Sequence, residues 1–146
     1  GGRVNATCGE GAVNGITALM TTAGNGHERV VELLLQHGAE VNLQSSYGVT
    51  ALMDAAHKGH ERVVELLLRG AEVNKQDSNG ETALMYAASQ GHERVVDLLL
   101  QHGAEVNQQD SSGGTALMSA AAHGHERVVD LLIRRGAEIN LQNSDG

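Results

Sequence analysis

Residues 77–107 decide the fold, and they read DSNGETALMYAASQGHERVVDLLLQHGAEVN. Parts of this stretch recur along most of the chain. The motif TALM begins at Thr17, Thr50, Thr82 and Thr115, and GHERVV begins at Gly26, Gly59, Gly91 and Gly124. Both motifs step by 33, 32 and 33 residues. Self-similarity at such a period is typical of solenoids, in which each repeat packs only on its neighbours.

Each repeat is predicted to form two short helices. Thr50 is an expected N-cap, because its hydroxyl can accept a hydrogen bond from a backbone amide of the following run ALMDAA. Gly59 ends that run, and a second helix with an apolar stripe is predicted to begin around His60, with Glu61 in its first turn. Gly70 is expected to supply a left-handed cap at its end. Helices of about ten residues are marginal alone in water, so the repeats must stack to form a core.

The connections between repeats carry the signature of type I turns. Asp77 or Asp110 stands first in the turn, and Gly80 or Gly113 stands fourth. The predicted fold class is therefore all-α, a stack of helix-turn-helix pairs joined by short β-turn or hairpin loops.

The second repeat lacks one residue. It reads LLLRG where the third repeat reads LLLQHG. We therefore expect its second helix to end early, near Leu68 or Arg69, with the neighbouring loop pulled inward.

The motifs GxTxL, AA, GH, VV and GAE followed by Val or Ile and Asn, in register within 77–107 and 110–140, resemble the ankyrin repeat. This resemblance implies a right-handed solenoid forming a single domain over 1–146. Its repeats are predicted at 15–47, 48–79, 80–112 and 113–146, and 1–14 is interpreted as the remnant of a preceding repeat and an irregular loop in a piece of a longer array. The family most often has TPLH where this chain has TALM, so we expect Met53 and its equivalents to be apolar fillers.

The composition limits the classes of function. The chain has 146 residues and a formal charge of −8, which works against binding to nucleic acid and to anionic membranes. The single cysteine, Cys8, excludes an internal disulfide. No apolar run approaches the roughly 20 residues of a membrane span. We expect a monomer in the cytoplasm, or alternatively the nucleus, that binds neither nucleic acid nor membranes.

No residue pattern indicates an enzyme, a cofactor or a metal site. Equivalent histidines form a ladder, His27, His60, His92 and His125. Stacked helices lie about 8–10 Å apart, whereas zinc ligands must each lie about 2 Å from the metal. We therefore expect these histidines to have a structural role. No phosphate loop, serine elbow or HExxH motif occurs either, and we expect no catalytic residue.

The positions at which the repeats differ are the candidate site. They are predicted to face solvent, and the resemblance implies that they line a concave surface that binds a protein partner. Tyr47 and Tyr86 are the expected anchors, while Asp54, Lys58, Glu81 and His123 would set polar specificity. The full candidate set is Tyr47, Val49, Asp54, His57, Lys58, Asn79, Glu81, Tyr86, Ser89, Gln90, Ser112, Ser119, Ala122 and His123.

Other interpretations of the sequence stay open. The variable positions are also compatible with drift at unconstrained surface residues. Near-identical repeats are compatible with an engineered or reconstructed scaffold without a native partner, and the chain could equally be a spacer or targeting module of a larger protein. The resemblance also implies possible hydroxylation of Asn42, Asn74 and Asn107, whereas hydrogen bonding to the hairpin backbone explains these residues equally well.

Overall fold

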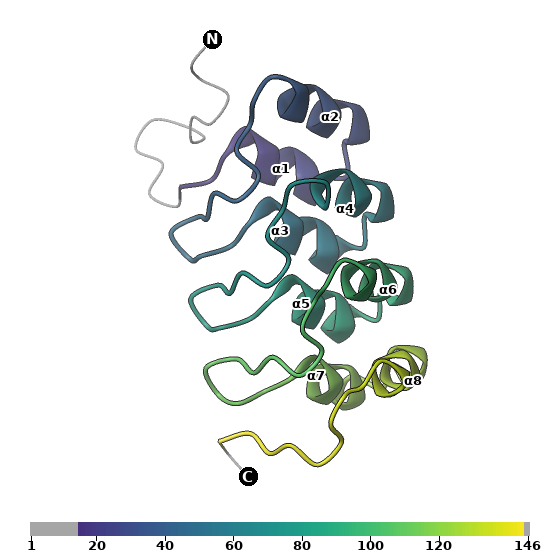
Figure 1. Ribbon diagram of the computed structural model, residues 1–146. Helices are drawn as coiled ribbons and strands as arrows, with labels where there is room; N and C mark the ends of the chain where they lie inside the picture. Colours follow the sequence, from purple (N-terminus) through teal and green to yellow (C-terminus); the bar gives the residue numbers. More distant parts are fainter. Residues whose placement is uncertain (1–14, 145–146) are drawn as a thin grey trace.

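The computed structural model describes residues 15–144, so the predictions for 1–14, including Cys8, lie outside the described residues. The described part holds eight α-helices and no β-strand. The inner helices are α1 (Ala18–Gly24), α3 (Ala51–Lys58), α5 (Ala83–Gln90) and α7 (Ala116–Ala122). The outer helices are α2 (Glu28–Gln36), α4 (Glu61–Leu67), α6 (Glu93–Gln101) and α8 (Glu126–Arg134). The predicted all-α solenoid is confirmed: each inner helix pairs with the outer helix that follows it, and the pairs stack in chain order (Figure 1).

The inner helices begin at the predicted threonine caps. In α3, the Thr50 hydroxyl accepts from the Met53 amide at 3.2 Å, and the other three inner helices repeat this bond at 3.2–3.4 Å. Met53 is buried, which confirms the expected apolar filler. Its sulfur also lies 3.4 Å from the Thr50 amide, so the thioether additionally takes part in the cap.

The outer helices bury the predicted apolar stripe. Val63, Val64 and Leu67 of α4 are fully buried, and Arg62 pairs with Glu65 on the exposed side at 3.3 Å. Burial of this stripe is the main stabilising contribution of each repeat, because every fully buried Val or Leu adds about 1.5–3 kcal/mol.

The missing residue of the second repeat shortens α4, as predicted. Helix α4 ends at Leu67 and has 7 residues, whereas α2, α6 and α8 have 9. The predicted left-handed cap at Gly70 is wrong, because Gly70 does not adopt a positive φ. In α2, Gly38 directly follows the C-cap residue and has a φ of 90°. In α4, Arg69 stands between the C-cap residue and the glycine, so Gly70 lies one place too late for that role.

Restoring the missing residue tests this explanation. Insertion of a glutamine between Leu68 and Arg69 is expected to lengthen α4 by about two residues, place the glycine directly after the cap and raise the free energy of unfolding by about 1 kcal/mol. Backbone chemical shifts would report the helix end and the left-handed glycine. The same insertion after Leu100, in the third repeat, which lacks no residue, should instead lower the free energy of unfolding. Equal effects at the two sites would contradict our explanation.

The histidine ladder ties each repeat to the one before it. The Nε2 atoms of His60, His92 and His125 donate to backbone carbonyls of Gly24, His57 and Ser89 at 2.9–3.0 Å. This confirms the structural role of these three histidines. Within residues 15–144, no group of three or more His, Cys, Asp or Glu side chains is placed to hold a metal ion.

Asparagines form a second ladder between hairpins. The Asn74 Oδ1 atom accepts from the Glu105 amide at 2.9 Å, and its Nδ2 atom donates to the Gly103 carbonyl at 3.1 Å. Asn42 and Asn107 make the equivalent bonds. The hydrogen-bonding interpretation of these residues is therefore confirmed, and their hydroxylation stays a prediction.

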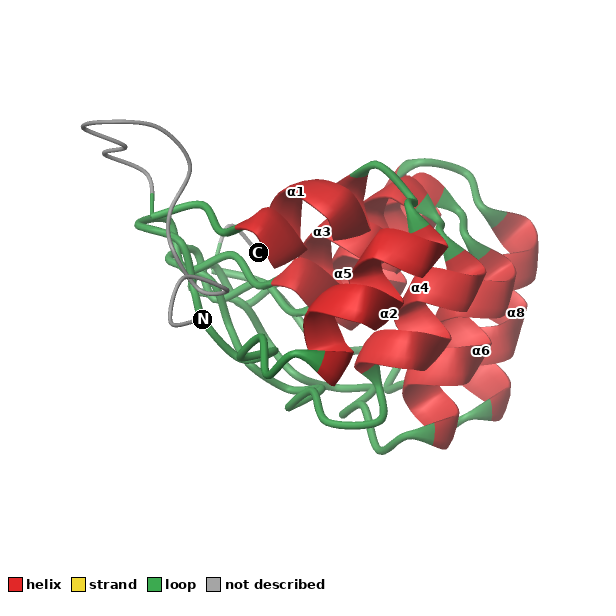
Figure 2. Ribbon diagram, turned by 90° about the horizontal axis from the view of Figure 1, so that it is seen from above, coloured by secondary structure: helices red, strands yellow, loops and turns green. Residues whose placement is uncertain are grey.

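The two helix layers pack with different closeness. Inner helices carry paired alanines such as Ala55 and Ala56, which are fully buried, and they contact one another more extensively than the outer helices do. Small side chains permit this closer approach, since the distance between helices depends on the residues at the contact. The stack is therefore tighter along the inner helices than along the outer helices. The hairpin loops project to one side of the helices (Figure 2).

Candidate functional site

The residues at which the repeats differ come together along the inner helices and the hairpin tips. None of the fourteen is buried. The exposed ones are Tyr47, Lys58, Asn79, Gln90, Ser112, Ala122 and His123, and the half-buried ones are Val49, Asp54, His57, Glu81, Tyr86, Ser89 and Ser119. The prediction that they face solvent is thus confirmed, whereas their role in binding stays a prediction.

The hairpin tips are held in register by the backbone. The Ser78 amide donates to the Tyr47 carbonyl at 2.9 Å, and Ser111 and Ser144 repeat this bond to Asn79 and Ser112 at 3.0 and 2.7 Å. Because these bonds use main-chain groups, the tips are fixed while their side chains stay available. Tyr47 is 64% exposed, and it is therefore the most accessible aromatic side chain of the site.

Tyr86 is tied into the protein itself. Its hydroxyl donates to the Asp77 carboxylate, which also accepts from the amides of Asn79 and Glu81. Its ring meets the ring of His57 edge to face, with the centroids 5.7 Å apart. Burial and the bond to Asp77 raise the pKa of Tyr86 above its usual value. Of the two predicted anchors, the Tyr86 side chain is therefore held in place by contacts within the protein, whereas the Tyr47 side chain is more exposed to solvent.

His57 stands between the second and third repeats. Its Nδ1 atom is buried without a hydrogen-bond partner among the described residues. Burial, followed by the positive charges of Lys58 and His92, lowers the pKa of His57. The imidazole is thus neutral at physiological pH, and it fills the space beside Tyr86 chiefly by packing.

A hollow of about 360 Å³ opens between the first two repeats, where the hairpin tip faces α1 and α3. Its walls include Ile16, Met20 and Val49, with Tyr47 beside them, and its polar side chains include Asp54 and Lys58 of α3. The structure therefore brings four of the predicted site residues, Tyr47, Val49, Asp54 and Lys58, around one cavity.

Asp54 is the group most affected by this environment. Burial raises the pKa of its carboxyl from 3.8 to about 6, against a smaller lowering by the charge of Lys58. No described residue forms a hydrogen bond or an ion pair with the carboxylate. At neutral pH a half-buried, unpaired negative charge therefore faces the hollow.

Asp54→Asn is expected to stabilise the folded protein at pH 7 by about 1 kcal/mol, because the buried carboxylate no longer has to ionise. The whole difference between the folded and unfolded pKa would correspond to a larger stabilisation, but the side chain is partly solvated, which reduces the effect. The folded pKa exceeds the unfolded one, so the wild type loses this stability as the pH rises from about 4 through 6, and the two proteins should converge below pH 4. Denaturant unfolding at both pH values measures the difference. The exposed Glu61→Gln is the control, and a destabilised Asp54→Asn at pH 7 would contradict the prediction.

The rest of the candidate surface is mainly polar. Glu81 lies at the hairpin of the third repeat, and burial and then the charge of Asp77 raise its pKa. In the third and fourth repeats the Ser89 hydroxyl donates to the Tyr86 carbonyl at 2.9 Å, and His123 bonds to the Ser119 carbonyl at 2.8 Å. Each of these two bonds lies within a single helix and its C-cap residue, so these side chains are held by their own repeat.

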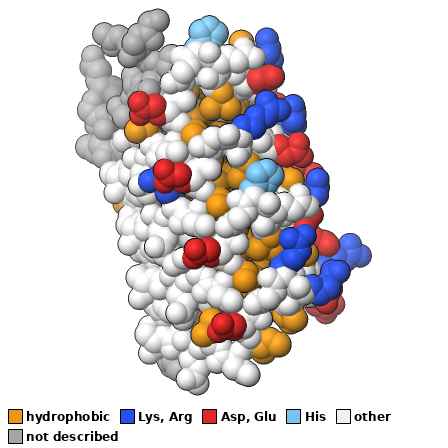
Figure 3. Space-filling view, viewed as in Figure 1, with side chains coloured by type: hydrophobic (Ala, Val, Ile, Leu, Met, Phe, Trp, Pro, Cys, Tyr) orange, Lys and Arg blue, Asp and Glu red, His pale blue; other side chains and the backbone are white. Residues whose placement is uncertain are grey.

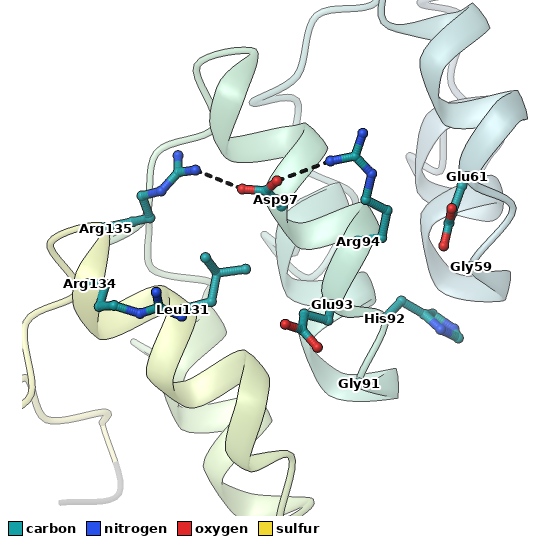
Figure 4. Close-up of a pocket in the computed structure, with 10 residues that line it drawn as sticks. All are labelled: Gly59, Glu61, Gly91, His92, Glu93, Arg94, Asp97, Leu131, Arg134 and Arg135. Atoms are coloured by element: carbon teal, nitrogen blue, oxygen red, sulfur yellow. Dashed lines mark hydrogen bonds and ion pairs between the residues drawn. The ribbon is translucent and has the colours of Figure 1, made fainter.

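A hollow of about 680 Å³ lies on the outer helices (Figure 4). Its centre is Asp97 of α6, which pairs with Arg94 at 3.1 Å and with Arg135, after α8, at 2.7 Å. Arg134 points along the same wall and pairs with Asp130 at 2.9 Å. Charged side chains of both signs follow the outer helices, beside an apolar strip (Figure 3). The arginines of this hollow are thus already paired with carboxylates, and the pair of Arg135 with Asp97 joins the fourth repeat to the third.

Six of the residues that line the inner hollow are absent from the predicted set: Ile16, Met20, Thr21, Gly24, Asn25 and Ser45. Gly24 and Thr21 of α1 line it, opposite Asp54. Both occupy positions at which the repeats differ, and Gly24 is the only residue without a side chain where the other repeats have His57, Ser89 and Ala122. That difference was the available signal.

The chain matches the family model described as "Ankyrin repeats (3 copies)" over residues 2–77 and 67–143. The chain belongs to the ankyrin repeat family. Ankyrin repeats are generally protein-interaction modules, and the family is typically non-catalytic. A comparison with curated proteins finds no match. Among residues 15–144, no helix is long and apolar enough to cross a membrane.

Proposed function

We propose that this chain is a non-catalytic module that binds a protein partner on its concave face. The observation that carries the proposal is the separation of fixed and variable residues. Buried positions such as Leu52 and Leu84 are identical between repeats, whereas the variable residues gather along the inner helices and hairpin tips. The same face holds the hollow with the unpaired Asp54 carboxylate, while the arginines that line the outer hollow are paired with carboxylates.

The charge and rigidity of this face support the same proposal. The variable side chains stand on hydrogen-bonded hairpin tips and closely packed inner helices, so their backbone is already ordered before a partner binds. Such preorganisation favours affinity, because binding then loses less conformational entropy. The face carries more negative than positive charge. Its acidic residues Asp54 and Glu81 stand against the single Lys58, and the turns contribute two further carboxylates, Asp77 and Asp110. We infer a partner whose docking surface is basic, bound by a monomer in the cytoplasm or nucleus, and no role in nucleic-acid or membrane binding.

Binders selected from a displayed library of random peptides against the immobilised chain test the proposal. They are then measured against two folded variants. The concave-face variant combines Tyr47→Ala, Gln90→Ala and His123→Ala, and the outer-face variant combines Glu28→Gln, Glu61→Gln and Glu126→Gln. We expect the concave-face variant to lose about tenfold or more in affinity and the outer-face variant to keep it. Binders that respond only to the outer-face variant would overturn the proposed function.

A further inference from the structure

The hollow beside Gly24 is a space that another repeat fills with its own side chain. At the junction of the second and third repeats, the His57 ring stands against the Tyr86 ring. At the junction of the first and second repeats, Gly24 takes the place of His57 and Asp54 takes the place of Tyr86. A Cβ atom on Gly24 would lie 3.5 Å from the Asp54 Cβ atom, an ordinary contact distance. The first junction therefore has room for a planar side chain that no residue of the described range 15–144 supplies.

The surroundings of the hollow indicate which charge a side chain that fills it should carry. The Asp54 carboxylate has no hydrogen-bond donor among the described residues, although burial has already raised its pKa to about 6. Lys58 lies one helical turn away, yet its ammonium does not come within ion-pair distance of that carboxylate. A half-buried carboxylate is stabilised by donors that reach it directly. The group that completes this site is therefore a cationic donor.

The walls of the hollow fit a long side chain with an aliphatic stem. Ile16, Met20 and Val49 offer apolar surface, and the exposed Tyr47 ring stands among the lining residues. Long basic side chains bury their methylene groups along such surface while their charged heads meet a polar partner. A guanidinium can also lie on an aromatic face such as that of Tyr47.

We propose, building on the proposed protein-binding function, that the partner inserts an arginine side chain beside Gly24 and that its guanidinium donates hydrogen bonds to Asp54. Arginine fits better than lysine, because its planar group matches the flat space that His57 fills at the next junction and can donate two parallel bonds to one carboxylate. The positive charge of Lys58, one helical turn away, repels the guanidinium and so weakens the pairing.

The test uses N-acetyl-arginine methylamide as the probe and its citrulline analogue as a neutral isostere. Each is titrated into the full chain, and backbone amide shifts are followed by NMR. We expect the arginine probe to bind about tenfold more tightly than the citrulline probe. The shifts should centre on Tyr47, Val49 and Asp54. The lysine analogue should bind with intermediate affinity.

Four variants separate this pairing from unspecific attraction to an acidic protein. Asp54→Asn, which is expected to fold stably, should reduce arginine binding to the level of citrulline. Lys58→Met should tighten arginine binding about twofold to threefold, because a positive charge that repels the guanidinium is removed. Gly24→His should block it by filling the space. Asp130→Asn removes an equal charge from α8 and should leave it unchanged.

Equal binding of the arginine and citrulline probes, an unaffected Asp54→Asn, or shifts centred on Asp97 would overturn this inference. The two experiments together distinguish a failure of this inference from a failure of the proposed function. If binders selected from the random library still depend on the concave face but carry no arginine preference, only the arginine site is wrong. If those binders ignore the concave face, the proposed function fails as well.

Discussion

Gly59→Ala is expected to lower the free energy of unfolding by about 3–4 kcal/mol. Gly59 ends α3 with a φ of 76°, where alanine costs about 1–2 kcal/mol. An added Cβ atom would also lie only 2.6 Å from Nδ1 of His92. The ring would have to move, and its Nε2 bond to the His57 carbonyl at 2.9 Å would be lost. Denaturant unfolding followed by circular dichroism measures the change.

Gly124→Ala is the matched control for the backbone strain. Gly124 holds the same place in the last repeat with a φ of 71°, and nothing lies within 4 Å of an added Cβ atom. It should cost only about 1–2 kcal/mol. The excess at Gly59 should shrink when His92→Ala is introduced together with it, because the clashing ring is then absent. Equal costs at Gly59 and Gly124, or strict additivity with His92→Ala, would show that the ring contact does not matter.

Most of the fold could be predicted from the sequence because its signals are local and occur in every repeat. A threonine N-cap, a glycine that ends a helix and an apolar stripe depend on neighbours within a few residues. The local structure that they predict therefore does not change when the repeat packs in the stack. Gly70 is the exception that shows the limit. Its predicted cap rested on residue type, whereas the left-handed conformation depends on how many residues separate the glycine from the last helical turn. One deleted residue changed that register.

The candidate site was less predictable, because variation identifies surface positions but not which of them meet. The hollow forms where Gly24 of one repeat faces Asp54 of the next. Gly24 differs from its equivalents in the other repeats, but the sequence does not show that it meets Asp54. Tyr86 shows the opposite case. Its residue type predicts an anchor for a partner, but its hydroxyl already donates a hydrogen bond to Asp77, nine positions earlier in the chain. Both outcomes depend on packing between elements, which a repeat motif does not encode.

Leu98→Ala is expected to lower the free energy of unfolding by about 3 kcal/mol, through lost burial and the cavity left behind. Leu98 lies in α6 and is only 4% exposed. The equivalent Leu131 of the last repeat is 9% exposed, whereas Leu33 of the first repeat is 38% exposed, so this position is covered chiefly by the preceding repeat. The cavity therefore weakens the interface between the second and third repeats, in a stack whose stability comes from such interfaces. The denaturation midpoint should fall, and helical signal should be lost at a lower denaturant concentration than in the wild type.

Leu33→Ala supplies the comparison that separates burial from residue type. Leu33 holds the same place in α2, but it is 38% exposed, since no described helix precedes α2 in the outer layer. Its truncation should cost about 1 kcal/mol, because much less surface is returned to water. The ratio of the two costs thus reports how much of each leucine's contribution comes from the neighbouring repeat. If both truncations cost the same, the outer layer is not stabilised by contacts between repeats, and the stacked arrangement would have to be held by the inner helices and hairpins alone.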